Sequence, residues 1–177
     1  MLGLNYAGEV GDGTNTDRWV PTAVTGVTNA VAIAGGWAHT CAVLRSGAVS
    51  CWGYNVRGQL GNETRAGTST AFAVSGITDA VAIGAGRFHT CAVLNSGAVQ
   101  CWGDNTLGQL GNDSPTDSLT PVTARGLSDA IAVIANEGSS CALRSTGDVW
   151  CWGDNAYGQL GDGTIATRRS PVTVIGL

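Results

Sequence analysis

Residues 85–112 read AGRFHTCAVLNSGAVQCWGDNTLGQLGN, and nearly the same string occurs fifty residues earlier. Residues 35–62 read GGWAHTCAVLRSGAVSCWGYNVRGQLGN, and residues 135–162 carry a third, more divergent copy. The same offset of fifty separates Asn5, Asn55, Asn105 and Asn155, and also Gly26, Gly76, Gly126 and Gly176. No insertion breaks the spacing, so the chain is an array of one repeated unit.

Each unit contains four short segments that favour β-strands. In the first unit, residues 30–34 form a small-residue strand, and residues 39–44 and 48–52 form a hairpin around the turn at 45–47. Gly47 ends this turn, which is typical of a three-residue hairpin loop with a left-handed residue. A polar loop with GQLG follows, and then a fourth strand, expected at residues 72–75 and 171–174. Pro171 is consistent with an outer edge strand.

Four strands in fifty residues indicate a propeller blade. A helical interpretation fails, because no segment of about 10 to 12 residues holds a 3.6-residue period free of Gly, Pro and β-branched residues. A β-solenoid is the structural alternative, but its coils usually repeat at shorter intervals.

The strings at 35–62 and 85–112 resemble the regulator of chromosome condensation repeat, with its HT pair, its hairpin ending in WG, and then Asn and GQLG. The resemblance implies an all-β fold, a β-propeller that is here a partial ring of about three and a half four-stranded blades. It predicts one propeller domain with a partial repeat at 1–28 (a loop and an outer strand), then repeats at 29–78, 79–128 and 129–177. The family does not share one function: its members include an exchange factor for a small GTPase, a plant UV-B photoreceptor, β-lactamase inhibitor proteins and bacterial surface proteins.

Composition argues against several classes of partner. The chain has 177 residues, 44% of them hydrophobic, so it can bury a core of ordinary domain size. Its nine basic residues, all Arg, face thirteen acidic ones and form no cluster, which disfavours binding to nucleic acid. No apolar stretch approaches the roughly 20 residues of a transmembrane helix, so we expect no membrane insertion.

The cysteines pair by symmetry about each hairpin turn. Cys41 and Cys51 share their midpoint, residue 46, with Leu44 and Ala48, so they should lie directly opposite each other on neighbouring strands. One alternative is six buried free thiols. A zinc site is a poorer alternative, because no CxxC pair is present to supply its ligands. We predict three disulfides and therefore an extracellular or cell-surface protein, of bacterial type. The predicted bonds are Cys41–Cys51, Cys91–Cys101 and Cys141–Cys151.

Motifs of catalysis or cofactor binding are missing from the sequence. His39 and His89 occupy equivalent positions in separate repeats, which favours a structural role over a base or a metal ligand. No P-loop or GxSxG occurs, and the absence of Lys removes Schiff-base chemistry. The acidic loops lack the dense carboxylates of a calcium site. We predict no enzyme, no catalytic or metal site and no cofactor.

Positions that differ between the repeats are free for recognition. Two regions vary most: the long loop after the hairpin, at 65–67, 115–117 and 165–167, and the turn between the first and second strands. The turn supplies a candidate binding surface of Trp37, Arg87, Phe88 and Glu137. Trp, Arg and Phe are residue types enriched in protein interfaces. The alternative is that these exposed turns are under little constraint, since random sequence drift would give the same variation between the repeats.

These observations favour a non-catalytic extracellular module that binds a protein partner or assembles with itself. The alternatives are a self-associating subunit of a surface layer or filament, and an exchange factor or inhibitor of one enzyme. An open arc of blades would expose apolar faces at its ends, so we expect a homo-oligomer or part of a longer chain.

Overall fold

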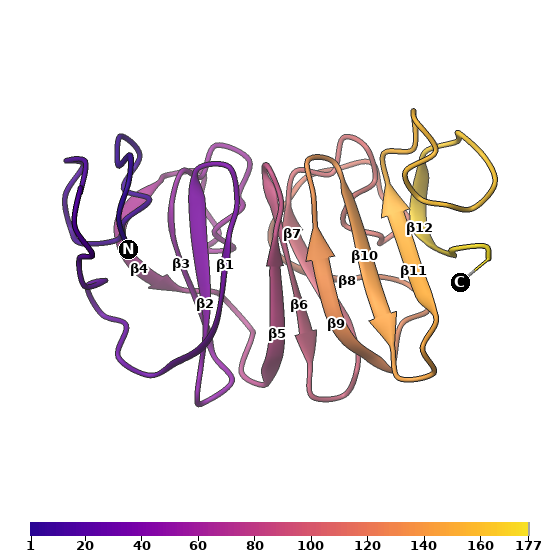
Figure 1. Ribbon diagram of the computed structural model, residues 1–177, viewed down its shortest axis with the longest axis horizontal. Helices are drawn as coiled ribbons and strands as arrows, with labels where there is room; N and C mark the ends of the chain where they lie inside the picture. Colours follow the sequence, from indigo (N-terminus) through magenta and orange to yellow (C-terminus); the bar gives the residue numbers. More distant parts are fainter. Residues whose placement is uncertain (177) are drawn as a thin grey trace.

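The computed structural model describes residues 1–176, which contain twelve strands and no helix. The strands form three four-stranded antiparallel sheets, each in simple sequential order (Figure 1). The first sheet contains β1 (Ala30–Gly35), β2 (His39–Leu44), β3 (Val49–Gly53) and β4 (Thr68–Ala73); the second β5 (Ala80–Ala85), β6 (His89–Leu94), β7 (Val99–Gly103) and β8 (Ser118–Thr123); the third β9 (Ala130–Ala135), β10 (Ser139–Arg144), β11 (Val149–Gly153) and β12 (Arg168–Thr173).

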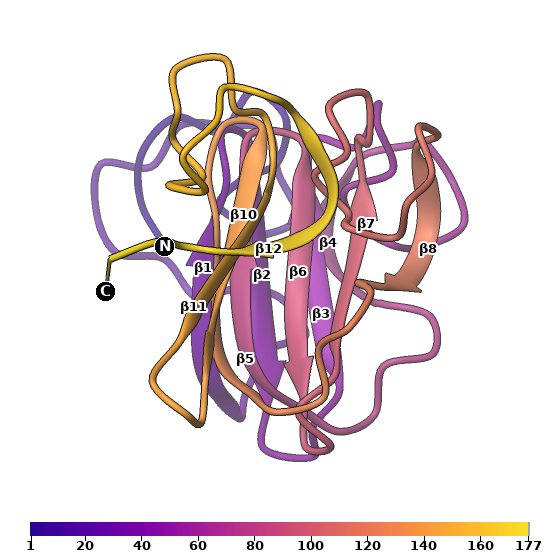
Figure 2. The same cartoon turned by 90° about the vertical axis from the view of Figure 1, so that its right-hand side faces the viewer.

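The three sheets are propeller blades arranged as an arc. The first strands of neighbouring blades lie side by side, β1 beside β5 and β5 beside β9, as the inner strands of a propeller do. Figure 2, turned by 90°, shows the last blade face on, with the other two stacked behind it. The all-β partial ring expected from the sequence is therefore confirmed. Within residues 1–176 no helix is long and apolar enough to cross a membrane.

The hairpin at the centre of each blade has the predicted register. Cys41 pairs with Cys51 across β2 and β3, and the Leu44 amide donates to the Ala48 carbonyl at 2.8 Å. Gly47 has a φ of 86°, the left-handed conformation that the turn requires. The fourth strand begins earlier than predicted, at Thr68, because its pairing extends to Gly53 across a bulge.

Blades are joined by a tryptophan from each blade that packs on the blade before it. Trp102 is fully buried in a cluster with Val43, Leu60 and Val74 of the first blade. Its indole nitrogen donates to the Gln59 carbonyl at 2.9 Å, which satisfies its polar group inside the core. Trp52 and Trp152 make the same hydrogen bond to the carbonyls of Glu9 and Gln109.

The first repeat differs from the expectation of a loop followed by an outer strand. Before Ala30, the described residues contain only an isolated bridge between Gly3 and Arg18. This bridge is equivalent to the pair of Gly53 with Thr68, and Met1 and Thr22, equivalent to Cys51 and Phe72, exchange two backbone hydrogen bonds of 2.6 and 2.8 Å. The backbone around residues 18–22 thus follows the path of an outer strand, but its few paired residues do not make a continuous strand.

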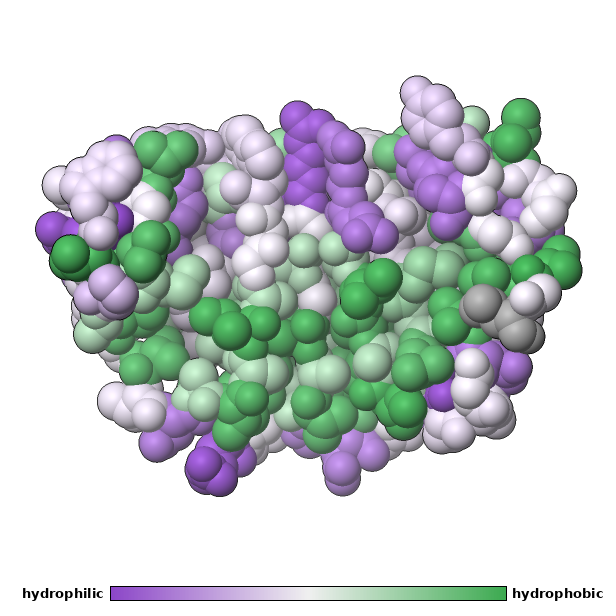
Figure 3. Space-filling model, in the orientation of Figure 1, coloured by the Kyte–Doolittle hydropathy of each residue, from purple (hydrophilic) through white to green (hydrophobic). Residues whose placement is uncertain are grey.

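The outward face of the last blade is more exposed than its internal equivalents. Leu143 is 37% exposed, whereas Val93, one repeat earlier, is 0% exposed because the last blade covers it. Apolar side chains also form a band over the inner strands β1, β5 and β9, which Figure 3 shows across this face of the molecule. The residues of this band are Val31, Ile33, Val81, Ile131 and Ile134.

Candidate protein-binding surface

The turns between the first and second strands of the blades lie together on one rim of the arc, the upper edge in Figure 1. Their backbones are connected: the Trp37 amide donates to the Gly86 carbonyl at 3.3 Å, and the Arg87 amide to the Asn136 carbonyl at 3.1 Å. The side chains of consecutive blades at this position are therefore held next to one another.

Three aromatic rings meet on this rim. The centroid of Trp37 lies 5.6 Å from that of Phe88, in an edge-to-face arrangement, and 6.1 Å from that of Tyr54. Tyr54 and Phe88 lie 6.2 Å apart, which closes the triangle. Trp37 remains 58% exposed, so the group is an aromatic surface and not part of the core. We call Trp37, Tyr54, Phe88 and Arg87 the rim cluster.

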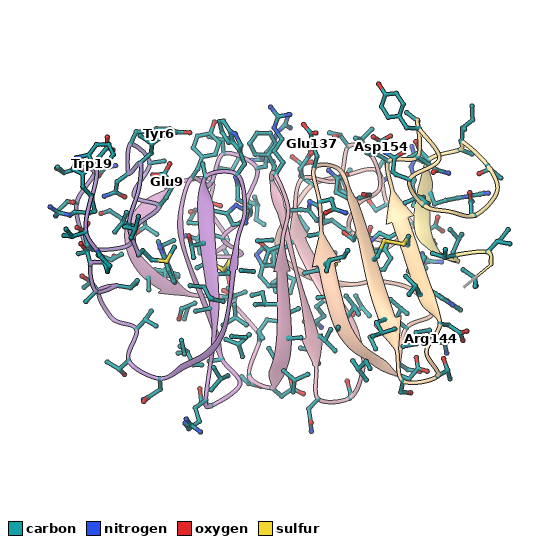
Figure 4. All side chains as sticks on the ribbon, viewed as in Figure 1. Tyr6, Glu9, Trp19, Glu137, Arg144 and Asp154 are labelled. Atoms are coloured by element: carbon teal, nitrogen blue, oxygen red, sulfur yellow. A yellow bond between two sulfur atoms is a disulfide. The ribbon has the colours of Figure 1, made fainter. Side chains whose placement is uncertain are left out.

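Arg87 joins the rings to the acidic side of the surface. Its guanidinium lies 5.1 Å from the centroid of Phe88 and 5.8 Å from that of Trp37, within cation–π range. It also forms an ion pair with Glu137, whose side chain is 77% exposed. The structure thus brings together all four residues singled out from the sequence. Figure 4 shows Glu137 on this rim with Asp154, away from Arg144 on the opposite rim.

Sequence reasoning missed Tyr54. The signal was available, since the equivalent residues in the next two repeats are Asp104 and Asp154. Beside the rim cluster, an open pocket of about 540 Å³ is lined by Arg87, Phe88, Asp104, Glu137 and Tyr157, among others. The rim therefore offers aromatic, cationic and acidic groups around one hollow.

The two histidines lie inside the blades and not on this surface. The Nε2 atom of His39 lies 2.9 Å from the Thr90 hydroxyl, which in turn donates to the Gln59 carbonyl, so His39 is the donor in the first of these bonds. His89 makes the equivalent contact with Ser140 at 2.8 Å. Burial lowers the pKa of His39 to about 4, and burial, with a smaller effect of His39, lowers the pKa of His89 to about 3. Both are neutral groups that connect neighbouring blades.

The cysteines lie in three pairs at bonding distance, each within one hairpin. The sulfur atoms are 2.09 Å apart for Cys41 and Cys51, 2.13 Å for the second pair and 2.08 Å for the third. Each pair joins the two central strands of its blade, as the hairpin symmetry predicts. Among residues 1–176, no three His, Cys, Asp or Glu side chains are grouped so that they could hold a metal ion.

Comparison with family models assigns the repeat. A model described as the regulator of chromosome condensation (RCC1) repeat matches residues 1–43, 46–93, 96–143 and 146–177, nearly the whole sequence. The chain belongs to the RCC1 repeat family. A second RCC1 repeat model matches residues 30–59, 80–109 and 132–159, which include the central hairpins.

Solved RCC1-type structures share this fold. Yeast RCC1 (Prp20), crystallised with Kap60, is 20% identical, with a TM-score of 0.76 over 85% of this chain and 38% of its own. Human WBSCR16 is 19% identical, with a TM-score of 0.82 over 97% of this chain and 46% of its own. A structure of Prp20p from Saccharomyces cerevisiae, reported with its binding to Gsp1p and histones, is 19% identical, with a TM-score of 0.77 over 85% of this chain and 39% of its own. The RCC1 repeats here thus span less than half of each of these chains, and no curated protein matches the sequence.

Proposed function

We propose that this chain is a non-catalytic, extracellular module that binds a protein partner through the rim cluster and Glu137. The observation that carries the proposal is the exposed triangle of Trp37, Tyr54 and Phe88 with Arg87 stacked on it. Aromatic residues and Arg contribute most of the binding free energy in many protein interfaces. The buried packing between the blades is made by Trp102 and its equivalents, whereas Trp37 is largely exposed.

Two further observations support the parts of this proposal. Yeast RCC1 forms a complex with Kap60, so a propeller of this family binds protein. Three cysteine pairs at bonding distance favour an oxidising compartment, since cytosolic thiols are kept reduced. His39 and His89 are buried between the blades, out of reach of a substrate, which supports a binding role over catalysis.

Affinity capture with matched variants tests the proposal. Immobilised chain is incubated with an extracellular protein fraction, and the retained proteins are compared for the wild type, Trp37→Ala and Trp19→Ala. Trp19 is 80% exposed and belongs to the first repeat, so it controls for the loss of an exposed Trp. We expect a protein that the wild type and Trp19→Ala retain and Trp37→Ala loses. Equal retention by all three would show that the rim cluster is not the binding surface.

A second candidate function is self-association through the last blade. Its outward face holds an apolar pocket of about 290 Å³, lined by residues such as Ile134, Leu143 and Val149. The same positions in the second blade are covered by the third, so a further blade, from another copy or from a longer chain, suits this face. Light scattering at micromolar concentration should report an oligomer that Leu143→Glu dissociates. A wild-type monomer would exclude this function.

A further inference from the structure

The loop after each central hairpin contains a Gln whose amide is held at both ends in two of the three blades. In the second blade, Gln109 Oε1 accepts the Leu107 amide at 2.9 Å, and Gln109 Nε2 donates to Asp104 Oδ2 at 2.8 Å. In the third blade, Gln159 Nε2 donates to Asp154 Oδ2 at 2.9 Å. The repeat thus pairs this amide donor with a carboxylate.

The first blade breaks this rule. Gln59 is fully buried, and its Oε1 accepts the Arg57 amide at 2.9 Å, as in the other blades. In the other two blades the equivalent Nε2 atom meets the carboxylate of Asp104 or Asp154, and in the first blade that position is Tyr54. Gln59 Nε2 has no hydrogen-bond partner among residues 1–176. A buried donor without a partner is rare in native proteins and unfavourable for stability.

The same exchange builds the aromatic surface. Tyr54 gives up the carboxylate but places its ring 6.1 Å from Trp37 and 6.2 Å from Phe88. The first blade has therefore lost an internal hydrogen bond at the position where the chain gains an exposed aromatic triangle. Departures of this kind from an otherwise consistent pattern are expected at functional sites.

We propose that the rim cluster binds an acidic side chain, Asp or Glu, of the protein partner. Its carboxylate accepts a hydrogen bond from Gln59 Nε2, in the role that Asp104 and Asp154 have in the other blades. The proposal rests on the proposed function, because it names the chemistry of the group that the same surface recognises.

Arg87 supplies the positive charge that selects a carboxylate over a neutral acceptor. It lies against Phe88 and Trp37, and its present partner is the exposed carboxylate of Glu137. Exposed ion pairs are weak, so the partner's carboxylate can replace Glu137. Gln59 is buried and the ring of Tyr54 is half-buried, so the proposed binding requires this ring to move aside as the partner's carboxylate enters. The rings then contact the apolar part of the bound segment.

Binding of short peptides tests the proposal. The probes are acetylated and amidated pentapeptides, Ala-Leu-Glu-Leu-Ala and its versions with Gln or Lys at the centre, titrated while the side-chain amide signal of Gln59 is followed by NMR. We expect the Glu peptide to bind about tenfold more tightly than the Gln peptide, as for a charge-assisted pair. The Gln59 signal should shift with the Glu peptide. Equal affinities, stronger binding of the Lys peptide, or no binding of any probe would overturn the proposal.

Variants at two positions sharpen this test. Tyr54→Asp gives Gln59 an internal carboxylate and should reduce the affinity for the Glu peptide to that for the Gln peptide, while Tyr54→Phe keeps the ring and should keep the binding. Glu137→Gln frees Arg87 and should tighten binding several-fold. Unchanged affinity in Tyr54→Asp would contradict the proposal. If a captured protein depends on Trp37 but the peptides do not discriminate charge, the proposed function stands and this inference fails.

Discussion

The two kinds of tryptophan should respond very differently to truncation. Trp102 is fully buried between the first and second blades, and its indole nitrogen donates to the Gln59 carbonyl at 2.9 Å. Trp102→Ala removes the whole of this buried area and leaves a cavity, so we expect a loss of about 3–5 kcal/mol in the free energy of unfolding. Trp37 is 58% exposed and packs only on neighbouring rings. Its truncation removes less than half as much buried area, about 2 kcal/mol at most.

Urea denaturation followed by far-ultraviolet circular dichroism measures both losses without depending on tryptophan fluorescence. Trp102→Phe is the matched control, because it keeps an aromatic ring in the core and removes the N–H donor. The loss in the free energy of unfolding for Trp102→Phe should lie between those for Trp37→Ala and Trp102→Ala. Equal shifts of the urea midpoint for Trp37→Ala and Trp102→Ala would refute the separation of rim from core on which the binding surface depends.

Three further predictions concern the blades. Peptide mapping without reduction should recover bonds within each hairpin, such as Cys91–Cys101, and reduction should cost up to about 3 kcal/mol for each bond; bonds between blades would contradict the register. The pKa values of His39 and His89 are about 4 and about 3 in the folded chain, against 6.5 in the unfolded chain. Protonation is therefore unfavourable in the folded state. The free energy of unfolding is highest above pH 6.5 and falls by about 1.4 kcal/mol per pH unit for each histidine as the pH decreases below that value. Urea midpoints at pH 7 and 5 should show this loss, and a double His→Gln variant that loses as much would contradict it. Gly97→Ala should destabilise the chain more than Gly147→Ala, because a Cβ at Gly97 would lie 2.5 Å from the Ser128 carbonyl oxygen. Gly147 has a similar positive φ but open space around it, so it is the matched control. Equal melting temperatures of the two variants would show that the turn at Gly97 is not in tight contact with the next blade.

Much of the fold could be predicted because the repeat encodes it locally. The hairpin symmetry that pairs Cys41 with Cys51 depends only on positions within one turn, and the structure has that register. The start of the fourth strand at Thr68 and the missing strand of the first repeat depend on which backbone is available to pair with them. Pairing of that kind is decided in three dimensions, so the sequence pattern placed these elements less well.

The candidate surface was predictable in part for the same reason. Variation between the repeats singled out Trp37, Arg87, Phe88 and Glu137, and the spacing of fifty places equivalent turns on one rim. Tyr54 directly follows β3, and its amide donates to the Ala38 carbonyl at 2.8 Å, so the register of the hairpin places it beside Trp37. The predicted hairpin ended at Trp52, and the contact was therefore missed. The unpaired amide of Gln59 could not be predicted, because the hydrogen bond of this Gln with Asp104 or Asp154 in the other blades is seen only in the structure.

The indole region of a ¹H–¹⁵N spectrum, recorded with and without the captured partner, tests whether the rim cluster is the binding surface. The chain has six Trp residues, each with one indole N–H signal. We expect the Trp37 signal to move when the partner is added, while the signals of Trp19 and of the buried Trp52, Trp102 and Trp152 stay in place. A complex that leaves Trp37 unchanged and shifts another indole signal would contradict the account.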